Sequence, residues 1–370
     1  MKRIPVTILT GFLGAGKTTL LNRLIGQEGF GNTAVIVNEF GEAGVDGALV
    51  AQADERAFAM SVGCICCTIS GDVRLTLLRL LDEAELGIGP SFDRVVIETT
   101  GVADPLPLLQ TFMTDEVILS RFTLNGVVTL VDAINGAYAL EQFDEARRQV
   151  AVADLVLMTK GDLARDPASM RDLDQLRDWI RQQAPNARLS SGAGATTDQV
   201  FPLAAFDPSG KPPDVREWLR FETHSHRHDH DHDHHHHHHH AHEHQHEETA
   251  SAFCFSAVGP MPLEALVRAT LALQTAFGSD LLRMKGLVEV TDEPGSALVL
   301  HVVGHVASPP RLLDGWPDGI DATRIVLIVA GSNRARAPEM LMELLPELRP
   351  FDAVPDPIAP KLEGDRIMAG

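Results

Sequence analysis

Residues 4–19, IPVTILTGFLGAGKTT, decide the fold, because an apolar run of β-forming residues leads through a glycine-rich loop into a helix-forming segment. Residues 11–18 fit the phosphate-loop pattern G-x-x-x-x-G-K-[ST], and the strand–loop–helix context distinguishes a nucleotide site from a chance match. Gly11, Gly14 and Gly16 let backbone N–H groups turn toward an anion, and the positive end of the helix dipole favours the same ligand. The sequence therefore predicts a site for a nucleotide phosphate.

Two side chains of this loop carry the expected chemistry. Lys17 is expected to reach the β- and γ-phosphates, and the hydroxyl of Thr18 is expected to bind Mg²⁺. Ala15 and Thr19 complete the candidate nucleotide contacts of the loop. The alternative is a glycine-rich turn that only caps a helix, but the complete motif after a strand favours the phosphate site.

Short β-branched runs alternate with longer amphipathic stretches through roughly the first two hundred residues, as in α/β proteins. The predicted strands are Ile4–Leu9, Thr33–Asn38, Arg94–Glu98, Gly126–Asp132 and Leu155–Thr159. The predicted helices include Lys17–Ile25, Asp72–Glu85 and Asp144–Val150. Buried apolar strands that alternate with helices indicate a parallel sheet covered on both faces. We therefore expect residues 1–205 to form one α/β P-loop domain.

The composition changes after residue 205, where FDPSGKPPD (206–214) is typical of a turn-rich connector. Residues 206–250 are expected to be a linker with a His-rich tract, and residues 251–350 a small α+β domain. The elements expected there are strands Ser251–Val258, Leu281–Thr291, Ala297–Val306 and Arg324–Val329 and helices Pro262–Ala276 and Pro338–Leu345. Residues 351–370, which contain several prolines, are expected to be a tail.

The end of a second predicted strand supplies further groups for the phosphate site. Residues 94–101, RVVIETTG, form an apolar strand that ends in an acid. Glu98 can therefore hold Mg²⁺ or its water shell, with the N–H of Gly101 near the γ-phosphate. A carboxylate that only caps a helix is the alternative for Glu98.

Residues 155–162, LVLMTKGD, are expected to recognise the base, because they are again a strand that runs into a polar loop. The carboxylate of Asp162 can accept hydrogen bonds from guanine N1 and N2, which adenine cannot offer. Lys160 is expected to lie over the base plane. These residues predict GTP rather than ATP.

Residues 38–42, NEFGE, follow a strand and precede a loop, which suits a switch that senses the nucleotide. Glu39 is a candidate nucleotide contact, and Glu42 is a candidate metal ligand. Both could equally be solvated surface acids, and their spacing does not decide between these roles.

Composition limits the other function classes. The 370-residue chain suits two domains, and its net charge of −20, with no basic stripe, disfavours nucleic acid. No apolar run approaches the roughly 20 residues that span a bilayer. The apolar N-terminal run ends in a glycine loop and a lysine rather than a cleavage site, so a cytoplasmic protein without a membrane partner is expected.

Three of the four cysteines crowd into residues 64–67 as Cys64, Cys66 and Cys67. Such close thiols cannot build a secreted disulfide framework, whereas thiolates are good ligands for zinc and Cu(I). In an extended segment Cys67 would point away from the other two, so we expect a turn that brings all three to one ion. Three sulfurs leave a fourth position for water or a partner's ligand. The alternative is inert buried cysteine, the role expected for Cys254 in its apolar strand.

Residues 224–246 hold 15 of the chain's 17 histidines and no apolar residue larger than alanine, so no core can form there. Neutral imidazole suits zinc, nickel, cobalt and copper, and the tract is expected to bind several ions weakly. The candidate ligands are His228, His230, His232 and His234. An expression tag and a solvated linker are the alternatives, and the internal position argues against a tag.

The remaining histidines, His301 and His305, are spaced to lie on one face of a strand. We expect them to be sheet residues with ordinary partners rather than metal ligands.

Together these segments resemble the CobW-type GTPases, metallochaperone-like relatives of the urease and hydrogenase maturation GTPases. The matching motifs are TGFLGAGKTTLLN at 10–22, NEFGE at 38–42, GCICC at 63–67, ETTGVADP at 98–105, TKGD at 159–162 and RMKG at 283–286. The resemblance implies GTP hydrolysis and metal handling, with Glu98 where most GTPases have Asp. Thr159 stands where the base loop usually has Asn, and the retained Asp162 is expected to preserve the guanine preference.

The sequence thus predicts a GTPase that binds zinc at the cysteine cluster and transfers it to client metalloproteins. Because the cluster lies between residues 38–42 and 98–101, GTP is expected to arrange the thiolates and hydrolysis to GDP to loosen them. One alternative is a chaperone for cobalt (Co²⁺), nickel (Ni²⁺) or iron that serves one enzyme. Another is a metal buffer based on the His tract, with vestigial nucleotide binding. Homodimerisation around the nucleotide is a further expectation from the GTPase class.

Overall fold

The computed structural model describes residues 3–38, 65–69, 72–201, 250–257, 259–309, 311–313, 315–316 and 322–351, with the backbone alone for residues 38 and 65–69. Several predicted features lie outside the described residues. They are Glu39, Glu42, Cys64, the tract histidines His228, His230, His232 and His234, the rest of the linker to residue 249, and the tail from residue 352.

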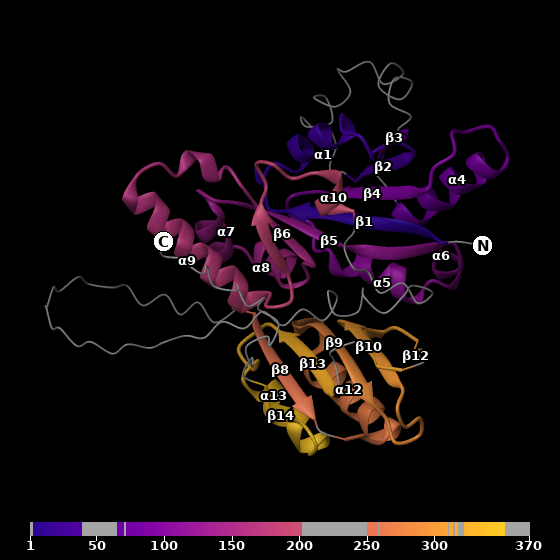
Figure 1. The fold of residues 1–370 in the computed structure, drawn as a ribbon, viewed down its shortest axis with the longest axis vertical. Coiled ribbons are helices and arrows are strands. Elements are labelled where there is room, and N and C mark those ends of the chain that lie inside the picture. The colour runs from indigo at the N-terminus through magenta and orange to yellow at the C-terminus, as the bar shows by residue number, and fades with distance from the viewer. Residues whose placement is uncertain are drawn as a thin grey trace, which may run out of the picture.

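The described part of the first 201 residues contains a parallel sheet of seven strands in the order β3-β2-β4-β1-β5-β6-β7 (Figure 1). Its strands are β1 (Ile4–Gly11), β2 (Thr33–Asn38), β3 (Ile65–Ile69), β4 (Arg94–Thr99), β5 (Phe122–Asp132), β6 (Leu155–Thr159) and β7 (Arg188–Ser191). Its helices are α1 (Lys17–Ile25), α4 (Val73–Glu85), α5 (Leu106–Thr114), α6 (Glu116–Arg121), α7 (Gly136–Gln142), α8 (Asp144–Ala151), the 3₁₀ turn η1 (Gly161–Leu163), α9 (Pro167–Gln183) and α10 (Thr197–Val200). Since β1 lies between β4 and β5, the glycine-rich loop that follows it lies at the centre of the sheet's carboxyl edge, where ligands of open α/β sheets bind.

Side chains alternate between the two faces of this sheet, as the period of a strand requires. In β2, Ala34 and Ile36 pack in the core beneath α4, α5 and α6, whereas Val35 and Val37 pack with α1 on the opposite face. Both faces are therefore buried, and the predicted α/β fold is confirmed.

The second sheet is antiparallel, in the order β11-β10-β9-β13-β8-β14, with β12 paired to β10. Its strands are β8 (Ser251–Ala257), β9 (Leu281–Glu289), β10 (Ala297–Val303), β11 (Val306–Ala307), β12 (Arg311–Leu313), β13 (Thr323–Val329) and β14 (Arg349–Pro350). Its helices are α12 (Leu263–Phe277), the 3₁₀ turn η2 (Gly278–Asp280) and α13 (Arg336–Leu344). One sheet face packs on α12 and α13. Leu282, Val326 and Ile328 on the other face join Val6 and Ile8 of β1 in one core, which we call the shared core.

Several details of this second sheet differ from the prediction. β10 ends at Val303, and Gly304 (φ 56°) and His305 form the turn to β11, so His305 does not share a strand face with His301. Cys254 lies in β8 beside the shared core, and burial raises the pKa of its thiol to about 11, as suits a structural cysteine.

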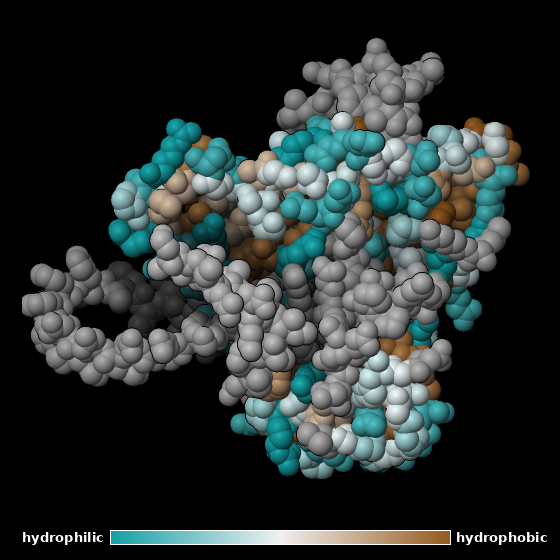
Figure 2. Space-filling model, in the orientation of Figure 1, coloured by the Kyte–Doolittle hydropathy of each residue, from teal (hydrophilic) through white to brown (hydrophobic). Residues whose placement is uncertain are grey.

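Figure 2 shows a mostly hydrophilic surface with hydrophobic residues around α4, at the upper right. There Leu86 and Ile88 are 73% and 75% exposed. Among the described residues, no helix combines the length and apolar character that crossing a membrane requires.

Candidate nucleotide site

The chain passes from β1 to α1 through residues 12–16 at the carboxyl edge of the sheet. Gly14 and Gly16 have φ angles of 73° and 93°, in the left-handed region that favours glycine. Gly16 is the N-cap of α1, so no side chain caps this helix, whereas Asp72 and Asp166 accept backbone N–H bonds at the starts of α4 and α9. The first turn of α1 therefore suits an external anion such as a phosphate.

Lys17 begins α1 and is held inside the loop, where the residue is only 9% exposed. Its ammonium group donates hydrogen bonds to the carbonyl oxygens of Gly11, at 2.8 Å, and Phe12, at 3.3 Å. The loop thus places a positive charge at the point where the sequence predicted the phosphates.

Thr18 and Glu98 are brought together from α1 and β4. The Thr18 hydroxyl donates a 2.6 Å hydrogen bond to Oε1 of Glu98, and Glu98 is only 4% exposed. A hydroxyl beside a carboxylate is a set of hard oxygen donors, which is the ligand chemistry that Mg²⁺ prefers. These two residues therefore fit the predicted magnesium site, while Thr19 is exposed on α1.

Gly101 lies against the phosphate loop. A Cβ at this position would lie 2.6 Å from Cδ2 of Leu13 and 2.8 Å from its Cα, so the two loops touch only because residue 101 is glycine. The carbonyls of Gly101 and Ala103 accept hydrogen bonds from Nε2 of Gln149, at 3.2 and 3.0 Å. We call residues 101–104 the β4 loop. Gln149, which holds this loop, was not predicted, because the contact spans 48 residues and leaves no local pattern in the sequence.

The predicted base loop follows β6. The hydroxyl of Thr159 donates a 2.7 Å hydrogen bond to the carbonyl of Ala15, which joins the base loop to the phosphate loop. Lys160 has a left-handed backbone (φ 58°), and its ammonium group donates to the Asp132 carboxylate at 2.7 Å. Asp162, two residues after Lys160, is exposed to solvent.

Asp132 is a second residue of the site that was missed. Its carboxylate accepts hydrogen bonds from Lys160, from the side chain of Asn135 and from backbone N–H groups of residues 134 and 135. Burial opposes ionisation, but these hydrogen bonds outweigh it and lower the pKa of Asp132. The signal was present in the sequence, because Asp132 ends an apolar strand just as Glu98 does.

The loop after β7 also approaches the base loop. The N–H of Gly192 donates to the Met158 carbonyl at 2.7 Å, and a Cβ at position 192 would lie 2.9 Å from Cγ2 of Thr159. Arg23 of α1 donates to the carbonyls of Gly192 and Ala193, at 2.6 and 2.8 Å. The sequence SSGAG at 190–194, after a strand, could have indicated this loop.

The predicted metal cluster is described only in part. Cys66 and Cys67 lie within β3, where they pair with Val35 and Ile36 of β2. The backbone at these two cysteines is therefore extended. Cys64, and Gly63 and Gly71, which would permit the expected turn, lie outside the described residues, so the three-cysteine site stays a prediction. Among the residues with described side chains, no group of three or more His, Cys, Asp or Glu is placed to hold a metal ion.

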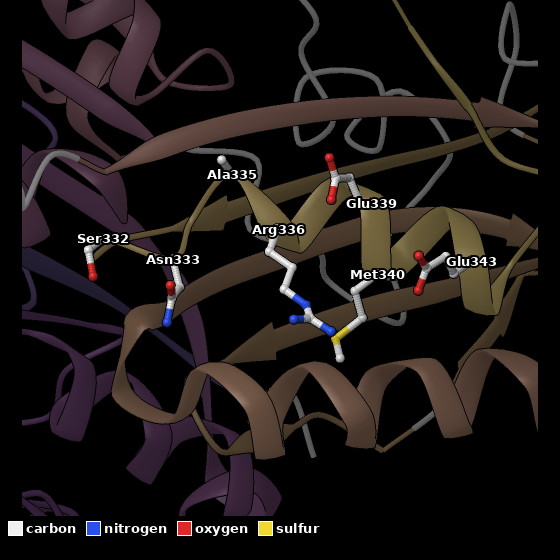
Figure 3. A pocket seen from close by; sticks show the side chains of 7 residues that line it. All are labelled: Ser332, Asn333, Ala335, Arg336, Glu339, Met340 and Glu343. Atoms are coloured by element: carbon white, nitrogen blue, oxygen red, sulfur yellow. The ribbon is translucent and has the colours of Figure 1, made fainter.

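A groove of about 360 Å³ lies elsewhere, along α13 in the second sheet's layer (Figure 3). Arg336 and Met340 extend toward one another from one face of this helix, and Glu339 and Glu343 also line the groove. Its lining carries two exposed carboxylates and one guanidinium, so its net charge is negative and disfavours a phosphate.

Two family models match the chain. The nucleotide-binding domain of CobW/HypB/UreG matches residues 5–189, and the C-terminal domain of the cobalamin synthesis protein cobW matches residues 250–345. The first match spans half of the 370 residues and contains every part of the nucleotide site described above except the loop after β7, whose residues Gly192 and Ala193 lie beyond residue 189.

The chain is also similar to curated proteins. It is 45% identical over 172 residues to the zinc chaperone YjiA of Escherichia coli, an alignment that covers 46% of this chain and 54% of that protein. It is 38% identical over 193 residues to the zinc chaperone CobW of Pseudomonas aeruginosa, covering 44% of this chain and 50% of that one. The alignments thus span about half the length of these relatives.

A solved structure resembles the chain over more of its length. The crystal structure of Zn(II)-bound YjiA GTPase from Escherichia coli has a TM-score of 0.67 and 28% sequence identity. That comparison covers 93% of this chain and 99% of the other, so the likeness includes both sheets.

Proposed function

Because the chain belongs to the CobW/HypB/UreG family of nucleotide-binding proteins, we propose that it hydrolyses GTP and uses the nucleotide state to control zinc transfer to client proteins. The observation that carries the proposal is the 2.6 Å hydrogen bond between Thr18 and the buried Glu98 beside the uncapped start of α1. It unites a hydroxyl, a carboxylate and an anion-binding helix end, which is what a magnesium-dependent nucleotide hydrolase requires.

In this proposal the chain's own residues bind and orient GTP. The first turn of α1 and Lys17 hold the β- and γ-phosphates, and the N–H of Gly101 lies near the γ-phosphate. Asp162 and the loop around Lys160 hold the guanine. Mg²⁺, held by Thr18 and Glu98, would neutralise charge that develops on the phosphates.

Zinc is proposed as the cargo, bound by Cys64, Cys66 and Cys67. Thiolates favour zinc, and the relatives named above are called zinc chaperones, which supports this choice over cobalt, nickel or iron. β3, which carries Cys66 and Cys67, pairs with β2, and β2 pairs with β4, the strand that contains Glu98. A path of two neighbouring strands thus links the metal segment to the phosphate site.

Competitive zinc titration tests the proposal, with the protein bound to GDP and to a nonhydrolysable GTP analogue. We expect at least about fivefold tighter zinc binding with the analogue, and loss of this binding in Cys66→Ser. Cys254→Ser is the matched control, since this cysteine lies in β8 of the second sheet and is not part of the Cys64–Cys67 cluster. Equal zinc affinity in the two nucleotide states would contradict nucleotide control, and ATP bound as tightly as GTP would contradict the guanine preference.

A metal buffer remains the second candidate function, because residues 224–246 hold 15 histidines. Deleting these residues distinguishes the two functions. A buffer loses most of its metal capacity, whereas a chaperone keeps nucleotide-dependent zinc binding at the cysteines.

A further inference from the structure

Helix α8 lies between the β4 loop and the second sheet. On the side of the loop, Gln149 is completely buried (0% exposed) and its amide donates to the carbonyls of Gly101 and Ala103. The main-chain carbonyl of Gln149 accepts a 2.7 Å hydrogen bond from the Thr129 hydroxyl of β5. The main chain of Gln149 is thus held by the central sheet, while its side chain is bonded to the β4 loop.

The neighbouring residue, Arg148, faces the second sheet. Its guanidinium donates a 3.1 Å hydrogen bond to the carbonyl of Ser279 in η2 and lies 3.7 Å from the Asp280 carboxylate. The same group lies 3.7 Å from the carboxylate of Asp104 in the β4 loop. One side chain therefore joins the β4 loop to the turn that precedes β9.

The residues just after α8 are held by β9. The carbonyl of Val152 accepts a 2.5 Å hydrogen bond from Arg283, and the Asp154 carboxylate pairs with Arg283 at 3.2 Å and Lys285 at 2.5 Å. These cations are buried, so separating them from Asp154 is costly. The C-terminal end of α8 and β9 therefore move as one unit.

We infer that α8 couples the β4 loop to the second sheet, with Gln149 as the residue that senses the loop and Arg148 as the residue that links it to η2. The inference rests on the proposed function, since it requires the β4 loop to change with the nucleotide. A displacement of Gly101 and Ala103 moves the partners of Gln149, and a displacement of Asp104 moves one of the two anions that hold Arg148. Both changes reach η2 and β9 through helix α8.

Hydrogen exchange of the full-length protein tests this coupling, with GDP and with a nonhydrolysable GTP analogue. In the wild type we expect exchange of the amides of residues 278–285 to differ at least about threefold between the two nucleotides. In Arg148→Ala this difference disappears at residues 278–280, which Arg148 links to the β4 loop, while GTP hydrolysis stays within about twofold of wild type. Arg148→Lys, which keeps one charged donor for the Ser279 carbonyl, restores part of the difference.

Gln149→Met tests the end of the coupling at the β4 loop. The substitution removes the two hydrogen bonds to the carbonyls of Gly101 and Ala103 at nearly constant side-chain volume. We expect it to lower kcat about tenfold with little change in KM, because the phosphate and base loops are untouched. The matched control is Gln183→Met in α9, a buried glutamine whose amide has no hydrogen-bond partner among the described residues. Arg177→Ala, also in α9, is the control for Arg148→Ala.

The outcomes separate the coupling from the GTPase activity. A nucleotide-dependent exchange difference that persists at residues 278–280 in Arg148→Ala overturns the coupling and leaves the proposed function standing. The same holds if the wild type hydrolyses GTP and shows no exchange difference at residues 278–285. A wild-type protein that binds no GTP overturns the proposed function, and the coupling with it.

Discussion

Thr159 joins the base loop to the phosphate loop through a single side-chain hydrogen bond. The base loop usually begins with Asn, and the sequence shows only that Thr replaces it. In the structure the Thr159 hydroxyl donates to the Ala15 carbonyl, so the base loop remains tied to the phosphate loop. The hydroxyl therefore supplies a donor for the phosphate loop, and the predicted recognition of guanine is left to Asp162.

Thr159→Val tests this tie, because it removes the hydroxyl at constant volume. We expect the affinity for GDP to fall about fivefold, which corresponds to the ~1 kcal/mol of one hydrogen bond, as measured by titration with a fluorescent GDP analogue. Thr159→Asn should bind within about twofold of wild type, since its amide can donate to the same carbonyl. Thr275→Val in α12, where the hydroxyl donates to the Leu271 carbonyl, is the control. Unchanged affinity in Thr159→Val would show that the tie has no part in binding.

At the scale of elements, the site depends on two loops that touch. The loop after β1 and the loop after β4 are neighbours because β1 and β4 pair in parallel, with Leu9 opposite Glu98. Their contact at Leu13 and Gly101 leaves no room for a Cβ. The loops after β1 and β4 can therefore approach this closely only because residue 101 has no side chain.

Gly101→Ala should push these loops apart and slow GTP hydrolysis roughly tenfold to a hundredfold, because small displacements of positioned groups are costly in catalysis. The hydrolysis rate and the melting temperature are measured together, and we expect the second to change little. Gly31→Ala is the matched control, since a Cβ there meets no atom within 4 Å. Hydrolysis by Gly101→Ala at the wild-type rate would contradict the role of this contact.

The sequence predicted those elements whose pattern is local. β1, α1, β2 and β6 were found within two residues of their bounds, since apolar runs next to glycine or acidic residues mark them clearly. β3 was missed because its partner, β2, ends 27 residues earlier in the chain, and pairing over such a distance leaves no trace in the residues 65–69 themselves. For the same reason the motifs revealed Lys17, Thr18 and Glu98 but not Gln149, whose role depends only on what folds against it.

At the scale of the whole molecule, the two sheets are joined by buried charges as well as by the shared core. His301 of β10 lies opposite Lys285 of β9 in the strand register, within the group formed by Arg283, Lys285 and Asp154. Burial, followed by the charges of Arg283 and Lys285, lowers the pKa of His301 well below its ordinary value, while Asp154 opposes the shift. His301 is therefore neutral in the folded protein near neutral pH.

This shift predicts acid sensitivity. In the unfolded chain His301 takes up a proton below about pH 6.5, whereas the folded protein does not, so the free energy of unfolding falls as the pH drops through that value. One such group contributes a slope of up to about 1.4 kcal/mol per pH unit. The pKa of Asp154 is also lowered, but its contribution to the free energy of unfolding begins to fall only below about pH 4. Asp154 therefore does not contribute to the pH dependence near pH 6.5.

Chemical denaturation of His301→Gln between pH 7 and pH 5 measures the effect. We expect a shallower pH dependence than in the wild type, whatever the change in absolute stability. His305→Gln, the same substitution in the exposed turn before β11, is the control for replacing an imidazole by an amide. Equal slopes for His301→Gln and the wild type would contradict the prediction.

The shared core has a consequence for how the protein is made. Val6 and Ile8 leave the ribosome early, but Val326 and Ile328, which cover the same core, follow more than three hundred residues later. At the usual 5–20 residues per second of synthesis, the part of this core that Val326 and Ile328 cover stays exposed for roughly 15 to 60 seconds. During that interval the nascent chain exposes aggregation-prone apolar surface. Its yield in a cell should therefore depend on chaperones that bind newly made polypeptides.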